Sequence, residues 1–192
     1  MKTIVGRTAL ITGASRGIGA HIARSVAAAG CHCILVARDG DALDTLSRGL
    51  QAEFGIRSAY YAVDLGTRDG PRVLVEHLAS DDHHIDILVN NAAVMTEGHF
   101  TEVPESSIDD GIVLNLRSVM VLSRLLLPKM VEQGSGHIVN IASLAGLGGV
   151  AYAETYCATK HAVVGFSRAL RATLRTRRES VGVSVVCPGY IS

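Results

Sequence analysis

The sequence predicts an α/β fold, with one doubly wound parallel sheet of about six strands and helices on both faces. Short apolar stretches alternate with stretches of helical periodicity along all 192 residues. Several apolar stretches, such as residues 34–36 and 183–186, run almost unbroken instead of alternating with polar residues. Strands covered on both faces have such sequences, and repeated β-α-β order makes the strands parallel.

The periodicity places the elements in one continuous series. Pro128 lies late in the fourth helix and should end or kink it, because proline cannot donate a helical hydrogen bond. No linker, repeat or low-complexity segment interrupts the series, so we expect a single domain over residues 1–192. The expected strands are residues 8–12, 32–37, 57–63, 85–90, 136–142 and 182–187, and the expected helices are residues 17–29, 41–53, 71–80, 105–132 and 153–177.

Composition excludes several classes of protein. Lys and Arg number 18, as do Asp and Glu, so no basic excess indicates a nucleic-acid partner. No stretch approaches 18 unbroken apolar residues, and the first seven residues are too short and polar for a secretory signal. The cysteines Cys31, Cys33, Cys157 and Cys187 form no C-x-x-C pair and lie near no histidine cluster. We therefore expect free thiols, no metal site, no membrane span and a cytoplasmic location.

A glycine-rich turn follows the first strand and opens the first helix. It reads Thr12-Gly13-Ala14-Ser15-Arg16-Gly17-Ile18-Gly19. Glycines permit a tight turn and a close approach of the backbone to a phosphate, and the N-terminus of the helix offers free N–H groups. The spacing G-x-x-x-G-x-G differs from the usual G-x-G-x-x-G of dinucleotide-binding turns. The turn nevertheless predicts a nucleotide phosphate site.

The end of the second strand indicates which nucleotide is preferred. An acidic residue there would bind a ribose 2′-hydroxyl, and an arginine would accept a 2′-phosphate. The strand ends Ala37-Arg38-Asp39, and Arg16 in the glycine turn can reach the same phosphate. Two guanidinium groups suit a phosphate dianion, so the sequence favours NADP. Asp39 is the alternative, since it would serve NAD.

Other polar residues lie where later strands end. Asp64, before Leu65, can bind an adenine amino group or serve as a turn or cap residue. Asn90 and Asn91 precede Ala92 and can tie loops together and line a crevice. Ligands of doubly wound sheets lie outside the carboxyl ends of the strands, where the strand order reverses. We expect strands one and four to flank that point.

Tyr156 and Lys160 stand four residues apart on the fifth predicted helix, so their side chains leave the same face. A free phenol has a pKa of about 10, too high for efficient proton exchange at neutral pH. An ammonium group about 4 Å away favours the phenolate by up to about 4 kcal/mol at an effective dielectric near 20. The pair therefore predicts an acid/base tyrosine, although the Y-x-x-x-K pattern alone is common.

Two further polar residues are candidates for the same site. Ser143 ends the fifth strand, where a hydroxyl can donate to a substrate carbonyl oxygen. Asn115 lies among apolar residues of the fourth helix, and a buried amide there must find hydrogen-bond partners. The alternatives are a loop serine and a core asparagine.

In this order and spacing the residues resemble the classical short-chain dehydrogenase/reductase family, and the resemblance extends from Thr8 to Gly189. It rests on the glycine turn, Asp64, Asn90-Asn91-Ala92, Asn115, Ser143, Tyr156, Lys160 and Pro188-Gly189. The resemblance implies a reaction that moves a hydride between NADP(H), or NAD(H), and an alcohol or carbonyl substrate. It also implies a homodimer through the helices at residues 105–132 and 153–177.

The family's site residues carry over to matching positions. Tyr156 would be the acid/base, Lys160 would lower its pKa and hold the nicotinamide ribose, Ser143 would polarise the carbonyl, and Asn115 would hold a relay water through its backbone. The implied cofactor-binding residues are Gly13, Ser15, Arg16, Gly17, Ile18, Gly19, Arg38, Asp64, Leu65, Asn91, Ala92, Tyr156, Lys160, Pro188, Gly189 and Ile191.

Two departures from the family pattern are visible. Ala93 stands where N-N-A-G would have glycine, and the sequence stops at Ser192, before the substrate-covering segment and last strand of the family. The second departure leaves another class of function open, a nucleotide-binding protein with little or no turnover. An epimerase or dehydratase of the extended branch fits less well, because Gly17 and Gly19 do not match T-G-x-x-G-x-x-G.

Overall fold

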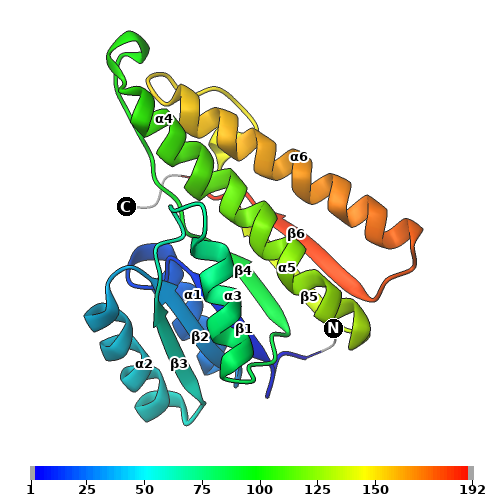
Figure 1. Cartoon of the computed structure of the whole chain (residues 1–192). Helices are drawn as coiled ribbons and strands as arrows, with labels where there is room; N and C mark the ends of the chain where they lie inside the picture. Colours follow the sequence, from blue (N-terminus) through cyan, green and yellow to red (C-terminus); the bar gives the residue numbers. More distant parts are fainter. Residues whose placement is uncertain (1–2, 190–192) are drawn as a thin grey trace.

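A computed structural model describes residues 3–189 of the chain. Its six strands form one parallel sheet in the order β3-β2-β1-β4-β5-β6, as Figure 1 shows. The central pair is β1 and β4, so the strand order reverses between them, as the sequence predicts. The strands are β1 (Thr8–Thr12), β2 (His32–Ala37), β3 (Ser58–Ala62), β4 (Ile87–Asn90), β5 (Gly136–Ile141) and β6 (Val181–Val186).

Helices cover both faces of this sheet (Figure 1). The observed ends differ from the predicted ones by at most two residues, because helix and strand ends fray. Two short 3₁₀ helices, η1 (Phe100–Glu102) and η3 (Leu144–Gly146), are additions that periodicity did not predict. The longer helices are α1 (Gly17–Ala28), α2 (Gly40–Phe54), α3 (Gly70–Ser80), α4 (Glu105–Ile112), α5 (Ser118–Glu132) and α6 (Glu154–Thr176).

Alternation along the strands divides the core into two layers. Ala9 and Ile11 of β1 pack with α1 and α2, whereas Leu10 between them packs with α3 and α5. All three side chains are fully buried. Burial on both faces explains why the strand sequences are nearly continuous apolar runs. It also specifies the register of the strands, because a slip would move apolar side chains to the wrong face.

The predicted fourth helix is continuous from Glu105 to Glu132 but contains one wide turn, a π-helical segment η2 (Val113–Arg117) between α4 and α5. Pro128 does not end the helix, which continues to Glu132. Its side chain is exposed, so water can hydrate the carbonyl group that loses its partner. This stretch is long and apolar enough to span a membrane by length and composition alone, but in the structure it packs against the sheet and α3.

Buried amide and hydroxyl groups connect two strands to the helices above them. Asn90 Nδ2 donates to Asn140 Oδ1 at 2.8 Å, and Asn140 Nδ2 donates to Ser167 Oγ at 2.8 Å. Ser167 Oγ in turn donates to the carbonyl oxygen of Val163 on α6. The three side chains are no more than 3% exposed, so the core contains a satisfied polar chain from β4 through β5 to α6.

The four cysteines are free, as predicted. Cys31, Cys33 and Cys157 are buried, and Cys187 is half-buried. Burial raises the pKa of Cys31 to about 11 and that of Cys33 to about 12, so both thiols stay protonated at neutral pH.

Candidate active site

The turn between β1 and α1 brings backbone groups to the carboxyl edge of the sheet. Gly13 and Gly17 have φ values of +65° and +55°, a conformation that favours glycine. A Cβ atom at Gly19 would lie 2.1 Å from the carbonyl oxygen of Gly13, so no side chain fits there. Arg16 precedes α1 and makes no side-chain cap, which leaves the first N–H groups of the helix available to an anion.

Thr12 holds this turn against the end of β4. Its Oγ1 donates to the carbonyl oxygen of Val89 and accepts from the N–H groups of Asn91 at 2.9 Å and Ala92 at 3.0 Å. Asn91 Nδ2 donates to the carbonyl oxygens of Thr12 and Gly13. The expected meeting of the glycine turn with Asn91-Ala92 is therefore present, and Thr12 is a positioning residue that sequence reasoning did not single out.

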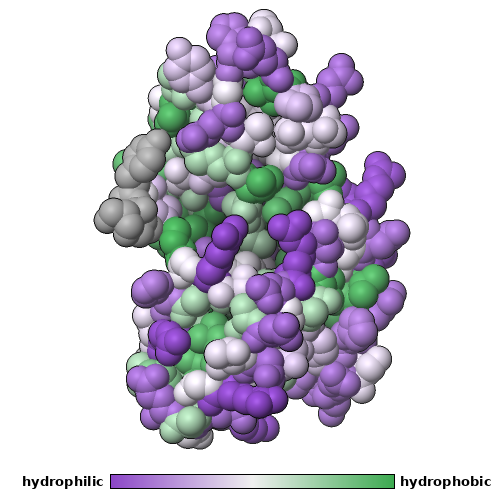
Figure 2. Space-filling model, turned by 90° about the vertical axis from the view of Figure 1, so that its left-hand side faces the viewer, coloured by the Kyte–Doolittle hydropathy of each residue, from purple (hydrophilic) through white to green (hydrophobic). Residues whose placement is uncertain are grey.

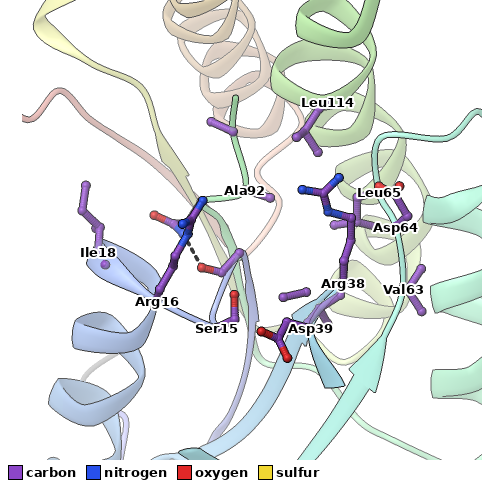
Figure 3. A pocket seen from close by; sticks show the side chains of 16 residues that line it. Ser15, Arg16, Ile18, Arg38, Asp39, Val63, Asp64, Leu65, Ala92 and Leu114 are labelled. Carbon is purple, nitrogen blue, oxygen red and sulfur yellow. Dashed lines mark hydrogen bonds between the residues drawn. The ribbon is translucent and has the colours of Figure 1, made fainter. Parts of the chain in front are cut away.

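A cavity of about 690 Å³ opens at this edge, between the glycine turn and the ends of β2, β3 and β4 (Figure 3). Figure 3 shows Arg16 and Arg38 on opposite sides of the cavity, each coming from a different loop. Residues 36, 37, 63, 93 and 114 also line it, although they were not predicted as cofactor-binding residues. The predicted cofactor residues in its lining are Gly13, Ser15, Arg16, Gly17, Ile18, Arg38, Asp64, Leu65, Asn91 and Ala92.

The two aspartates at the cavity have local structural partners. Asp39 caps α2, with Oδ1 accepting from the N–H of Ala42 at 3.0 Å. Asp64 Oδ1 accepts from the N–H of Gly66 at 2.8 Å, which makes a tight turn after β3. Asp64 therefore has the turn role that sequence reasoning gave as its alternative, Asp39 has a cap role that was not predicted, and both remain at the cavity wall.

Asn90 lies elsewhere than expected. Its side chain is 3% exposed and enters the polar chain with Asn140, away from the cavity. Successive residues at a strand end point to opposite sides of the sheet, so only one asparagine of the pair can face the crevice, and that one is Asn91.

Lys160 is the most deeply buried cation at this edge among the residues that the structure describes, with 3% of its surface exposed. Its Nζ donates to the carbonyl oxygen of Ile141 at 2.8 Å and lies 5.5 Å from the centre of the Tyr156 ring. Burial lowers the pKa of Lys160 to about 8, and the nearby Cys187 thiol opposes part of that shift. The lysine and the half-buried tyrosine are therefore neighbours on one face of α6, as their spacing predicts.

Ser143 is held beside α6 by the short helix that follows it. Its Oγ accepts from the N–H of Ala145 at 3.1 Å and caps η3. A Cβ atom at Gly146 would lie 2.7 Å from the carbonyl oxygen of Lys160, so this glycine permits the close contact of η3 with α6. The N–H of Leu144 donates to the carbonyl oxygen of Pro188, which brings the segment after β6 to the same place.

Asn115 lies in the π-helical turn and uses its whole side chain. Its Oδ1 accepts from the N–H of Val94, and its Nδ2 donates to the carbonyl oxygen of Val94, both at 2.8 Å. Nδ2 also lies 3.3 Å from Thr159 Oγ1, which donates to the carbonyl oxygen of Tyr156. Because its side chain is occupied, any role of Asn115 toward a water falls to the backbone of the wide turn, a feature frequent at functional sites.

The four predicted catalytic residues thus lie on α6 or beside it. Thr159 connects Asn115 to Tyr156, and Lys160 is bonded to Ile141, two residues before Ser143. None of them lines the enclosed part of the cavity, and neither does Pro188 or Gly189. Ile191 lies outside the described residues. Figure 2 views the molecule from the side on which the chain leaves β6, and shows apolar surface sunk between hydrophilic residues there.

A six-stranded parallel sheet with a glycine turn at its switch point defines a dinucleotide-binding class of fold. The family model described as short chain dehydrogenase matches residues 7–192. The chain belongs to this family of oxidoreductases, which confirms the resemblance. In sequence it is 38% identical to the ketoacyl reductase HetN of Nostoc, over 100% of this chain and 66% of that protein.

Solved structures give the same result. The L-sorbose reductase of Gluconobacter frateurii, complexed with NADPH and L-sorbose, superposes with a TM-score of 0.93 and 34% identity, over 99% of this chain and 72% of that one. A short-chain dehydrogenase/reductase of Burkholderia phymatum in complex with NAD has a TM-score of 0.92 and 30% identity, over 100% of this chain and 68% of that one. The chain therefore spans about two thirds to three quarters of the length of these relatives.

Proposed function

We propose that this protein is an NADP(H)-dependent oxidoreductase that interconverts alcohols and carbonyl compounds, with Tyr156 as the acid/base. The observation that carries the proposal is the buried Lys160 ammonium beside the Tyr156 ring, next to a cavity with a glycine-turn phosphate site. Burial of an ammonium without a charged partner is costly, and such arrangements concentrate at functional sites.

The chain's own residues fit a nicotinamide dinucleotide. The glycine turn leaves no room for a Cβ at Gly19 and directs helix N–H groups to the cavity, as a pyrophosphate requires. Arg16 and Arg38 offer two guanidinium groups for a 2′-phosphate, whereas Asp39 is engaged as a helix cap. The structures of relatives contain NADPH in one case and NAD in another, so both remain available to the fold.

When bound, the cofactor supplies or accepts a hydride at the substrate carbon. In the reductive direction Tyr156 donates its phenolic proton to the carbonyl oxygen, which becomes the alcohol. The Lys160 ammonium stabilises the phenolate that remains, and the Ser143 hydroxyl donates to the same oxygen as charge develops there. Asn115 holds the loop at Val94 and the start of α6 in register, so it positions Tyr156 through Thr159.

Tyr156→Phe tests this assignment directly. The variant loses only the hydroxyl, so turnover should fall below about a tenth of wild type while NADPH affinity is nearly unchanged. NADPH binding followed by fluorescence, together with absorbance at the reduced nicotinamide band, gives both quantities. Activity retained in Tyr156→Phe would show that Tyr156 is not the proton donor. NADPH binding without turnover of any carbonyl by the wild type would favour a nucleotide-binding protein instead.

A further inference from the structure

The two loops that flank the predicted catalytic residues expose large apolar side chains. Val94 lies four residues after Asn90, and Leu144 lies four residues after Asn140, its registered partner on the neighbouring strand. Leu144 and Leu147 are 56% and 55% exposed. The exposed apolar residues of the two loops are Val94, Met95, Phe100, Leu144, Leu147 and Tyr152. Exposed apolar side chains gathered around a reactive centre mark a binding surface.

These loops hold few charges, and those they hold are acidic. Residues 143–153 contain no Asp, Glu, Lys, Arg or His. Residues 93–104 contain Glu97 and Glu102, both exposed, and the single histidine His99. Arg38 follows β2, which is three strands away from β5, or about 14 Å at the usual strand spacing. Lys160 beside Tyr156 is buried and donates to the carbonyl oxygen of Ile141. Within the described residues, a carboxylate or phosphate on the substrate would therefore meet no lysine or arginine in either loop.

Hydrogen bonds fix the two loops relative to each other and to the predicted catalytic residues. The N–H of Gly98 donates to the carbonyl oxygen of Tyr152 at 3.0 Å, and Val94 is bonded at both backbone groups to Asn115. Tyr152 has a φ of +64°, a strained conformation for a residue with a side chain. The apolar side chains are thus presented by an ordered frame, which lowers the entropy cost of binding.

We propose that the substrate is an uncharged carbonyl compound with apolar or aromatic substituents, recognised by the loops at residues 94–100 and 144–152, and that carboxylated and phosphorylated carbonyl compounds are rejected. The proposal rests on the proposed oxidoreductase function and names its substrate class. In this proposal Leu144 and Leu147 contribute most of the apolar contact, because they lie one and four residues after Ser143 and are both more than half exposed.

Acetophenone and 4-acetylbenzoate test this selectivity, since they present the same carbonyl and differ by one carboxylate. With NADPH, kcat/KM for acetophenone should exceed that for 4-acetylbenzoate by at least about tenfold. Leu147→Arg should shrink this ratio by about tenfold, because it supplies the missing cation. The matched control is Val73→Arg, which adds the same cation at an exposed apolar residue on α3, and it should leave the ratio unchanged.

Binding measured without turnover separates this proposal from the proposed function. Saturation-transfer NMR should show contact of acetophenone, but not 4-acetylbenzoate, with the NADPH-loaded protein, and Leu144→Ser/Leu147→Ser should abolish it. If neither ketone is reduced but this selective binding is present, the redox function fails and the apolar site stands. Equal or better reduction of 4-acetylbenzoate overturns the substrate class and leaves the redox function intact. If the protein shows neither selective binding of acetophenone nor reduction of any ketone, both the substrate class and the redox function are overturned.

Discussion

At the level of single residues, burial of the Lys160 ammonium at the candidate active site lowers the stability of the fold. Its side chain is buried with one hydrogen bond, to Ile141, and burial lowers its pKa from 10.5 to about 8. A lysine with a lowered pKa in the folded state penalises folding below that pKa, and the penalty disappears as pH rises toward the unfolded value. At neutral pH the penalty is therefore fully present.

Lys160→Met should consequently raise the free energy of unfolding by about 1–3 kcal/mol at pH 7, because it removes a buried charge and keeps the apolar stem. The gain should shrink between pH 8 and pH 10.5, and turnover should be lost. Urea unfolding at several pH values measures this effect. Equal or lower stability at pH 7 would show that the hydrogen bond to Ile141 outweighs desolvation of the ammonium.

Arg38 is the residue at which the nucleotide preference should be decided. Arg38→Asp removes a guanidinium and adds a carboxylate that repels a 2′-phosphate. The charge-assisted pair is worth about 1.5–3 kcal/mol, so NADPH affinity should fall by roughly one to two decades while NADH binding improves. Titration of both cofactors measures the change, with Arg48→Asp on the exposed face of α2 as control. A wild type that binds both equally would contradict the assignment.

At the level of elements, the wide turn of the fourth helix has a structural role that single-residue reasoning does not reveal. Ser118 N–H donates to Val113 C=O across five residues, and Asn115 within this turn binds both backbone groups of Val94. The helix thereby fixes the loop that follows β4. In a regular helix Asn115 would be rotated relative to the residues that follow it, and its hydrogen bonds to Val94 would change.

Asn115→Ala should leave the N–H and C=O of Val94 without their partner and cost about 2–4 kcal/mol of stability. Turnover should fall more than NADPH affinity, because the loop at Val94 flanks Tyr156 and not the phosphate site. Urea unfolding and kinetics measure the two effects. Ser123→Ala, which removes a buried hydroxyl elsewhere on the same helix, is the comparison and should cost less. Similar losses of stability and turnover in the two variants would show that Asn115 is a polar core residue with no special role in positioning the loop.

Most elements could be predicted from periodicity, because burial on both faces of the sheet produces apolar runs separated by amphipathic helices. The wide turn at Asn115 could not, since it adds no visible break to the apolar pattern. The side to which Asn90 points was also undetermined, because alternation assigns adjacent residues to opposite sides without saying which side is which. Leu114 and Ala93 entered the cavity wall through three-dimensional packing alone.

At the level of the whole molecule, we propose a homodimer through α5 and α6, which run side by side at one end of the sheet (Figure 1). Ile112 and Met120 expose 43% of their surfaces on the long helix and suit such an interface. Ile112→Arg/Met120→Arg should give a monomer in light scattering with an unchanged circular dichroism spectrum. Val73→Arg on α3 is the control and should keep the wild-type mass. A wild-type monomer would refute the proposal.

The buried chain Asn90–Asn140–Ser167 also bears on how the strands find their alignment during folding. Parallel strands made mostly of Val, Ile and Leu have little chemical reason to prefer one alignment over a neighbouring one. A slip of β5 by one residue against β4 would turn the Asn140 amide to the other side of the sheet, and Asn90 and Ser167 would lose it as a partner. Each buried group left unpaired costs about 1–3 kcal/mol. The two asparagines therefore favour one register of β5 against β4. That register also sets the positions of Asn91 and Ser143, which follow the same two strands.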